Sequence, residues 1–141
     1  MALPSGRSAD PHEARILVVD DMVELTESLT VLLECNGYTV KSAFDGEAAL
    51  MVARDFRPHC VLLDIHMPGM NGLELTRQLR MVSGDDIVLI AMTGQEPRSP
   101  QVRDAFALVD HYLHKPFDIE MLEKVLPPLQ SVSASKQPAP M

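Results

Sequence analysis

The chain has 141 residues, of which 46% are hydrophobic and 23% are charged, and it carries a formal net charge of −8. This length and composition predict one globular domain, so the chain as a whole is neither a disordered segment nor a disulfide-stabilised miniprotein. The negative charge argues against a general affinity for nucleic acid or an anionic membrane, and no apolar stretch approaches the roughly 20 residues of a transmembrane helix. Cys35 and Cys60 lack CxxC spacing, so we expect reduced thiols and a cytoplasmic protein.

The two ends of the chain differ from its middle. Residues 1–14 and 131–141 are rich in Ser, Pro and Ala without apolar periodicity, so we expect flexible tails around one folded domain at 15–130. Within that domain, strand-like and helix-like segments alternate. In chain order the pattern predicts strand 16–19, helix 22–35, strand 38–42, helix 45–54, strand 60–63, helix 72–80, strand 87–91, helix 100–108, strand 111–114 and helix 119–126. Asp45, Asn71 and Asp118 are residue types that favour the helix N-cap.

Five successive βα units imply a parallel sheet with helices on both faces. Strands 16–19, 60–63 and 87–91 are unbroken apolar runs, which is typical of strands buried on both faces. Strands 38–42 and 111–114 mix polar with apolar residues, so we place them at the sheet edges. The sequence therefore predicts an α/β, flavodoxin-like, doubly wound fold with five strands in the order 2-1-3-4-5, whose ligands bind beyond the carboxyl ends of the strands.

Polar residues stand where the predicted strands end: Asp20 and Asp21, Asp64, Thr93, and Lys115. Each has an ordinary explanation by itself, as a helix cap, a turn residue or a surface lysine. Neighbouring strands lie about 4.8 Å apart, however, so the three carboxylates would crowd and repel one another unless a cation lay among them. Oxygen ligands with open water positions suit Mg²⁺. A carboxylate beside a metal ion, a lysine and a hydroxyl is suited to accept a phosphoryl group as nucleophile.

Four motifs in this order, ILVVDD, LLDIHMPGMNG, AMTG and YLHKPF, resemble those of the receiver domain of two-component response regulators. The resemblance covers about 15–126. It implies that Asp64 accepts a phosphoryl group from a histidine kinase or a histidine phosphotransfer protein. It also implies that Mg²⁺ is held by Asp20, Asp21, Asp64 and the backbone carbonyl of His66.

The same resemblance assigns the remaining site residues. Lys115 and Thr93 would bind the phosphoryl oxygens, Thr93 and Tyr112 would form the switch, and the bond before Pro116 would be cis. Gly94 and Leu108 stand where the family more often has Ala and Gly, and these departures concern the output face rather than the phosphorylation residues.

As a function, the resemblance implies a phosphorylation-dependent signalling switch that changes the binding of a downstream protein partner. We expect Mg²⁺-dependent phosphorylation and dephosphorylation of the protein itself, and no enzymatic turnover of an external substrate. A phosphorylation-dependent dimer through the fourth helix, the last strand and the last helix is compatible with this expectation.

Three other functions are less compatible with the sequence than the switch. A phosphatase of the haloacid-dehalogenase type uses an aspartate nucleophile within DxD after the first strand, whereas Asp20 and Asp21 are adjacent. A flavin-binding module needs a phosphate-binding loop at that position, where an acidic pair repels phosphate. A receiver-like scaffold that is never phosphorylated is disfavoured because each acceptor-site residue is present.

Overall fold

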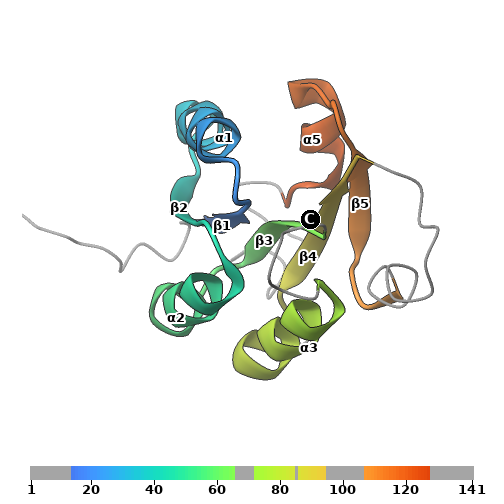
Figure 1. Ribbon diagram of the computed structural model, residues 1–141. Helices are drawn as coiled ribbons and strands as arrows, with labels where there is room; N and C mark the ends of the chain where they lie inside the picture. The colour runs from blue at the N-terminus through green and yellow to red at the C-terminus, as the bar shows by residue number, and fades with distance from the viewer. Residues whose placement is uncertain (1–13, 66–71, 85, 95–106, 128–141) are drawn as a thin grey trace, which may run out of the picture.

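The computed structural model describes residues 14–65, 72–84, 86–94 and 107–127. Five parallel strands form one sheet in the order β2-β1-β3-β4-β5, which confirms the predicted order (Figure 1). The strands are β1 (Arg15–Val19), β2 (Thr39–Ala43), β3 (Cys60–Asp64), β4 (Val88–Thr93) and β5 (His111–His114). The helices are α1 (Val23–Cys35), α2 (Gly46–Phe56), α3 (Gly72–Ser83) and α5 (Ile119–Val125).

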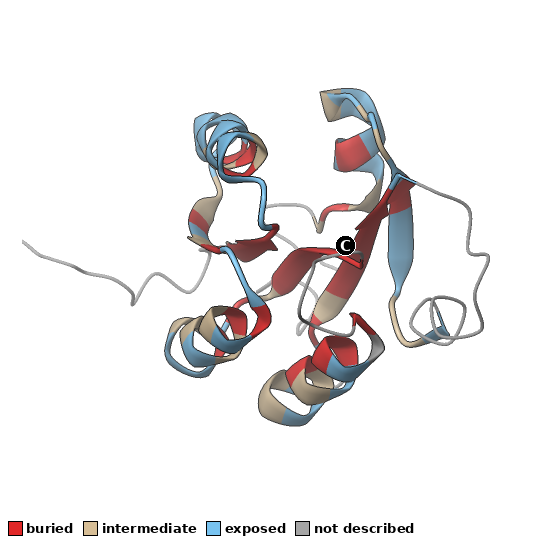
Figure 2. Ribbon diagram, viewed as in Figure 1, coloured by how far each residue is buried: buried red, intermediate tan, exposed pale blue. Residues whose placement is uncertain are grey.

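Helices cover both faces of the sheet. Figure 1 shows α1 and α5 on one face and α2 and α3 on the other. Successive side chains of a strand point to opposite faces, so β1 supplies Ile16 and Val18 to the core under α1 and α5, and Leu17 and Val19 to the core under α2 and α3. The central strands are therefore buried on both sides, and exposed residues lie on the outer faces of the helices and on β5 (Figure 2).

The edge positions of β2 and β5 follow from their composition. All five residues of β3 are buried, whereas Leu113 is the one buried residue of the four in β5. Figure 2 shows the same contrast between the buried central strands and the exposed edge. The mixed strands thus lie at the edges as expected.

Two of the three predicted N-caps can be checked. The carboxylates of Asp45 and Asp118 each accept the backbone N–H three residues further on, at 2.8 Å and 2.9 Å. Helix α2 runs two residues past its predicted end, to Phe56, and ends at Arg57 in the left-handed region with φ 54°. The Nε of Arg15 donates to the carbonyls of Phe56 and Arg57 at 2.9 Å and 3.0 Å, so a distant side chain stabilises this helix end.

Several expectations fall on parts of the chain outside the described residues. These are the Asn71 cap, the tail 131–141 and most of the helix predicted at 100–108, of which the structure describes residues 107 and 108. Of the predicted tail 1–14, Ala14 is described: it is buried, and its carbonyl accepts the N–H of Thr39 at 3.0 Å. Ala14 therefore belongs to the fold.

Candidate functional site

The alternation of side chains places three charged residues on one side of the sheet. Asp20 directly follows β1, Asp64 ends β3, and Lys115 directly follows β5. Each lies two residues after a strand residue of the core under α1 and α5, and these core residues are Val18, Leu62 and Leu113. Because side chains alternate along a strand, all three charged side chains lie on the α1 and α5 side of the sheet. Strand parity therefore brings an ammonium group to the same side as two carboxylates.

Lys115 forms ion pairs with both carboxylates. Its Nζ lies 2.9 Å from Oδ2 of Asp20 and 3.4 Å from Oδ2 of Asp64. The side chains of Asp20, Asp64 and Lys115 are 0%, 10% and 22% exposed. Burial alone would lower the pKa of Lys115, but the hydrogen bond to Asp20 and the charges of Asp64 and Asp20 outweigh burial and raise the pKa. The ammonium is thus held in its charged form.

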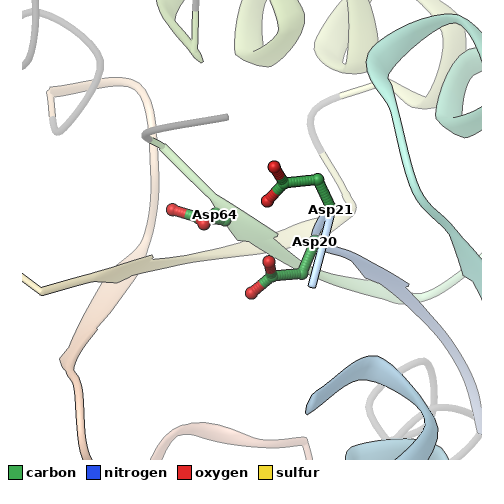
Figure 3. Close-up of side chains that lie close together, drawn as sticks. All are labelled: Asp20, Asp21 and Asp64. Atoms are coloured by element: carbon green, nitrogen blue, oxygen red, sulfur yellow. The ribbon is translucent and has the colours of Figure 1, made fainter. Parts of the chain in front are cut away.

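The third carboxylate, that of Asp21, completes an acidic cluster. One oxygen from each of Asp20, Asp21 and Asp64 lies within 4.8 Å of the others, and Figure 3 shows the three carboxylates gathered beyond the ends of β1 and β3. Asp21 is exposed, in contrast to the other two. The cluster holds three carboxylates, and one ammonium pairs with two of them, so an excess of negative charge remains. Closely spaced oxygen ligands with one open side fit a hard divalent cation such as Mg²⁺.

Both oxygens of Asp20 have donors. Oδ2 accepts from Lys115, and Oδ1 accepts the backbone N–H of Met22 at 3.0 Å. The carbonyl of Asp20 lies 3.1 Å from the hydroxyl of Thr26, a fully buried residue of α1. Thr26 is not among the site residues predicted from the sequence. Its one signal is that Thr26, Leu29 and Leu33 share the inward face of α1, so a hydroxyl occupies a position where an apolar side chain is the norm.

Thr93 lies beside the cluster. It ends β4, is 1% exposed and follows Met92, the register partner of Asp64. Its carbonyl accepts the N–H of Lys115 at 2.7 Å. The backbone of the lysine and the end of β4 are therefore joined directly.

The remaining predicted residues stand further out. Tyr112 is 58% exposed on β5 and pairs in register with Ala91. The peptide bond between Lys115 and Pro116 is cis. His66, whose carbonyl was expected to bind metal, lies outside the described residues.

A second residue that the sequence analysis passed over is Gly72, the first residue of α3. A Cβ at this position would lie 2.6 Å from the carbonyl oxygen of Ile65, the residue that follows Asp64. Only a glycine lets α3 begin this close to the end of β3.

With this geometry in place, the chain can be compared with known proteins. Residues 16–127 match the family model of the response regulator receiver domain, and the chain belongs to this family. Receiver domains of response regulators interact with histidine kinases or phosphotransfer proteins and are not, in general, enzymes that turn over a substrate. No helix of the described residues is long and apolar enough to cross a membrane.

Individual relatives agree with this assignment. The chain is 45% identical over 108 residues to the response regulator MprA of Mycobacterium ulcerans, which covers 77% of this chain and 46% of that protein. It spans about half the length of the curated relatives that it matches. Among solved structures, it superposes on the chemotaxis protein CheY4 of Vibrio cholerae with a TM-score of 0.70 and 29% identity, covering 81% of this chain and 99% of that chain.

A further solved structure is that of the response regulator TrrA of Thermotoga maritima in complex with Mg²⁺ and BeF. It has a TM-score of 0.68 and 34% identity, and the match covers 80% of this chain and 99% of that chain.

Proposed function

We propose that this receiver domain is a phosphorylation-dependent switch and that Asp64 is its phosphoacceptor. The observation that carries the proposal is the ammonium of Lys115, which pairs with Asp64 on the same side of the sheet as Asp20. The donor is a histidine kinase or a histidine phosphotransfer protein that acts in the cytoplasm, and the free thiols of Cys35 and Cys60 agree with a reducing compartment.

The three acids differ in ways that single out Asp64. Asp20 is fully buried, and its two oxygens accept from Lys115 and from the N–H of Met22. Asp21 is exposed and lies within the acidic cluster. The side chain of Asp64 is buried but not fully enclosed, at 10% exposed against 0% for Asp20, and it has an ammonium 3.4 Å away that can stabilise added negative charge.

The proposed step transfers one phosphoryl group. A carboxylate oxygen of Asp64 forms a bond to phosphorus while the bond from phosphorus to the donor imidazole nitrogen breaks, and the imidazole leaves with that electron pair. The acyl phosphate that forms carries more negative charge than the carboxylate. Lys115 lies close enough to bind its oxygens, and the hydroxyl of Thr93 would donate to another of them.

The acidic cluster would hold Mg²⁺ through Asp20, Asp21 and Asp64, together with the carbonyl of His66. Two observations support this assignment: one oxygen from each of the three carboxylates lies within 4.8 Å of the others, and the similar protein TrrA was solved with Mg²⁺ and BeF. Bound Mg²⁺ would neutralise charge on the transferred phosphoryl group.

The signal would leave the site through Thr93 and β5. The carbonyl of Thr93 is bonded to the N–H of Lys115, which directly follows β5, so a shift of Thr93 toward a phosphoryl group acts on the strand that carries Tyr112. The exposed ring of Tyr112 would then turn inward and change the surface that a downstream partner or a second copy of the chain binds.

Treatment with acetyl phosphate and Mg²⁺ tests the proposal. We expect one phosphoryl group per chain by intact mass, located on Asp64 by peptide mass spectrometry. Asp64→Asn should abolish the modification, whereas Asp55→Asn, which removes an exposed carboxylate on α2, should leave it unchanged. A label on any other residue of the wild-type protein would overturn the assignment, and an unmodified wild type would favour the scaffold instead.

A further inference from the structure

The first turn of α1 holds the backbone of the acidic pair in an unusual way. The N-cap residue Met22 provides no side-chain hydrogen bond, in contrast to Asp45 and Asp118, which cap α2 and α5 with their carboxylates. Asp20 and Asp21 precede Met22 directly, so the segment that carries them enters a helix without a side-chain cap. Other contacts must therefore determine its conformation.

One of these contacts is the hydroxyl of Thr26. Its Oγ1 lies 2.9 Å from the carbonyl oxygen of Met22 and 3.1 Å from that of Asp20, and the residue is 0% exposed. The contact with Met22 is the common hydrogen bond of a helical threonine to the carbonyl four residues earlier. Thr30 donates in the same way to the carbonyl of Thr26 at 2.8 Å. The contact with the carbonyl of Asp20 is different, because Asp20 lies six residues before Thr26, outside the helix and directly after β1.

The hydroxyl therefore contacts the backbone on both sides of Asp21. The carbonyl of Asp20 belongs to the residue before Asp21, and the carbonyl of Met22 belongs to the residue after it. The Asp20 side chain is also held by Lys115 and by the Met22 N–H. Asp21 is the exposed member of the cluster, so the direction of its carboxylate depends on the backbone that Thr26 contacts.

We propose that Thr26 is a positioning residue for the metal site: its buried hydroxyl orients the backbone between Asp20 and Met22 so that the Asp21 carboxylate faces Asp64. This role rests on the proposed binding of Mg²⁺ by the acidic cluster. Residues that orient metal ligands from outside the coordination sphere typically change metal affinity by about 10–100-fold when they are lost. Thr26 touches backbone rather than a ligand side chain, so we expect the low end of this range.

The test compares Thr26→Val with Thr30→Val. Both variants keep the β-branched shape and remove a hydroxyl that bonds to the carbonyl four residues earlier in α1, but only Thr26 reaches the end of β1. We expect Thr26→Val to weaken Mg²⁺ binding about tenfold, measured through the amide resonances of Asp21 and Met22, with no change for Thr30→Val. Without metal, the N–H of Met22 should exchange faster in Thr26→Val than in Thr30→Val.

Thr26→Ser restores the hydroxyl without the methyl group and should recover most of the Mg²⁺ affinity. If Thr26→Val binds Mg²⁺ as tightly as the wild type, the positioning role is wrong while the metal site stands. If the wild-type protein itself binds no Mg²⁺, the metal site and the positioning role are both overturned.

Discussion

The two ends of the sheet each contain a cation paired with an acid, but the pairs are built differently. At the amino end, the guanidinium of Arg80 donates to Asp110 at 2.9 Å and to the carbonyls of Ile87 and Leu108 at 2.7 Å and 3.1 Å. The same oxygen of Asp110 accepts the N–H of Leu89 at 2.8 Å. One positive charge meets one negative charge, and both groups also bind backbone.

At the carboxyl end, one ammonium pairs with two carboxylates of a cluster of three. The charges are unbalanced, and the exposed Asp21 leaves the cluster open to solvent. An ion pair at a strand end is therefore not in itself a functional signal. A balanced pair that also binds backbone joins secondary structures, whereas an excess of one charge on an open side can recruit a ligand of the opposite charge.

The largest expected effect is that of removing the ammonium at the carboxyl end. Lys115→Met leaves the fully buried carboxylate of Asp20 without its cation, and we expect the free energy of unfolding at pH 7 to fall by about 3 kcal/mol. Urea unfolding without metal measures this loss. Lys124→Met, which removes an exposed lysine on α5, should stay within about 0.5 kcal/mol of the wild type.

The pH dependence of this difference identifies its source. The folded state raises the pKa of Lys115, so the stabilisation is fully present below the unfolded-state pKa of about 10.4 and is lost as the pH rises through the folded-state pKa. The stability difference between wild type and Lys115→Met should therefore be flat between pH 7 and about 9 and should shrink above about 10.4. A difference that persists at high pH would mean that packing, not charge, is responsible.

A smaller effect is expected at the amino end. Arg80→Met leaves Asp110 and two carbonyls without their guanidinium donor, which should cost about 2 kcal/mol because Asp110 is partly exposed and water can replace some of the bonds. Arg77→Met, an exposed change on the same helix, serves as the control. The Mg²⁺ affinity of Arg80→Met should equal that of the wild type. A parallel loss of affinity would show that the two ends are not independent.

The smallest expected effect is that of replacing one aspartate by asparagine, which should change the free energy of unfolding in opposite directions at the two ends of the sheet. Asp64→Asn removes a carboxylate that faces two other acids and one ammonium, so the metal-free protein should gain about 0.5–1 kcal/mol. Asp110→Asn removes the single acid of a balanced pair and should lose about 1 kcal/mol. Differential scanning calorimetry without metal measures both. Destabilisation by Asp64→Asn would contradict the charge excess at the carboxyl end.

Much of the fold and the place of the site could be predicted from local pattern. Unbroken apolar runs identified the central strands, mixed runs identified the edges, and strand ends placed Asp20, Asp64 and Lys115 together. Strand parity accounts for this success because a period of two determines the face on which each residue lies. The end of α2 could not be placed in the same way, since Arg57 adopts the left-handed conformation without a glycine to signal it.

Hydrogen bonds from side chains to backbone carbonyls could not be predicted from the sequence. Thr26 binds a carbonyl at the end of β1, and Arg80 binds the carbonyls of Ile87 and Leu108. Every residue has a backbone carbonyl, so neither composition nor periodicity indicates which carbonyl accepts a hydrogen bond from a given side chain. The crowding of the three acids indicates a cation among them, but the sequence does not show that Lys115 pairs with both Asp20 and Asp64.

The ion pairs of Lys115 have a consequence for how the chain acquires its activity. Lys115 lies 95 residues from Asp20 and 51 from Asp64 along the chain. Contacts over such separations are slow to form, because the entropy of closing the loop is lost before the contact stabilises the chain. During synthesis the three acids emerge well before the lysine, and β5 must dock on β4 to deliver it. A chain in which β5 has not docked on β4 would lack the ion pairs of Lys115, so under the proposed function only the complete fold would offer this lysine to an added phosphoryl group.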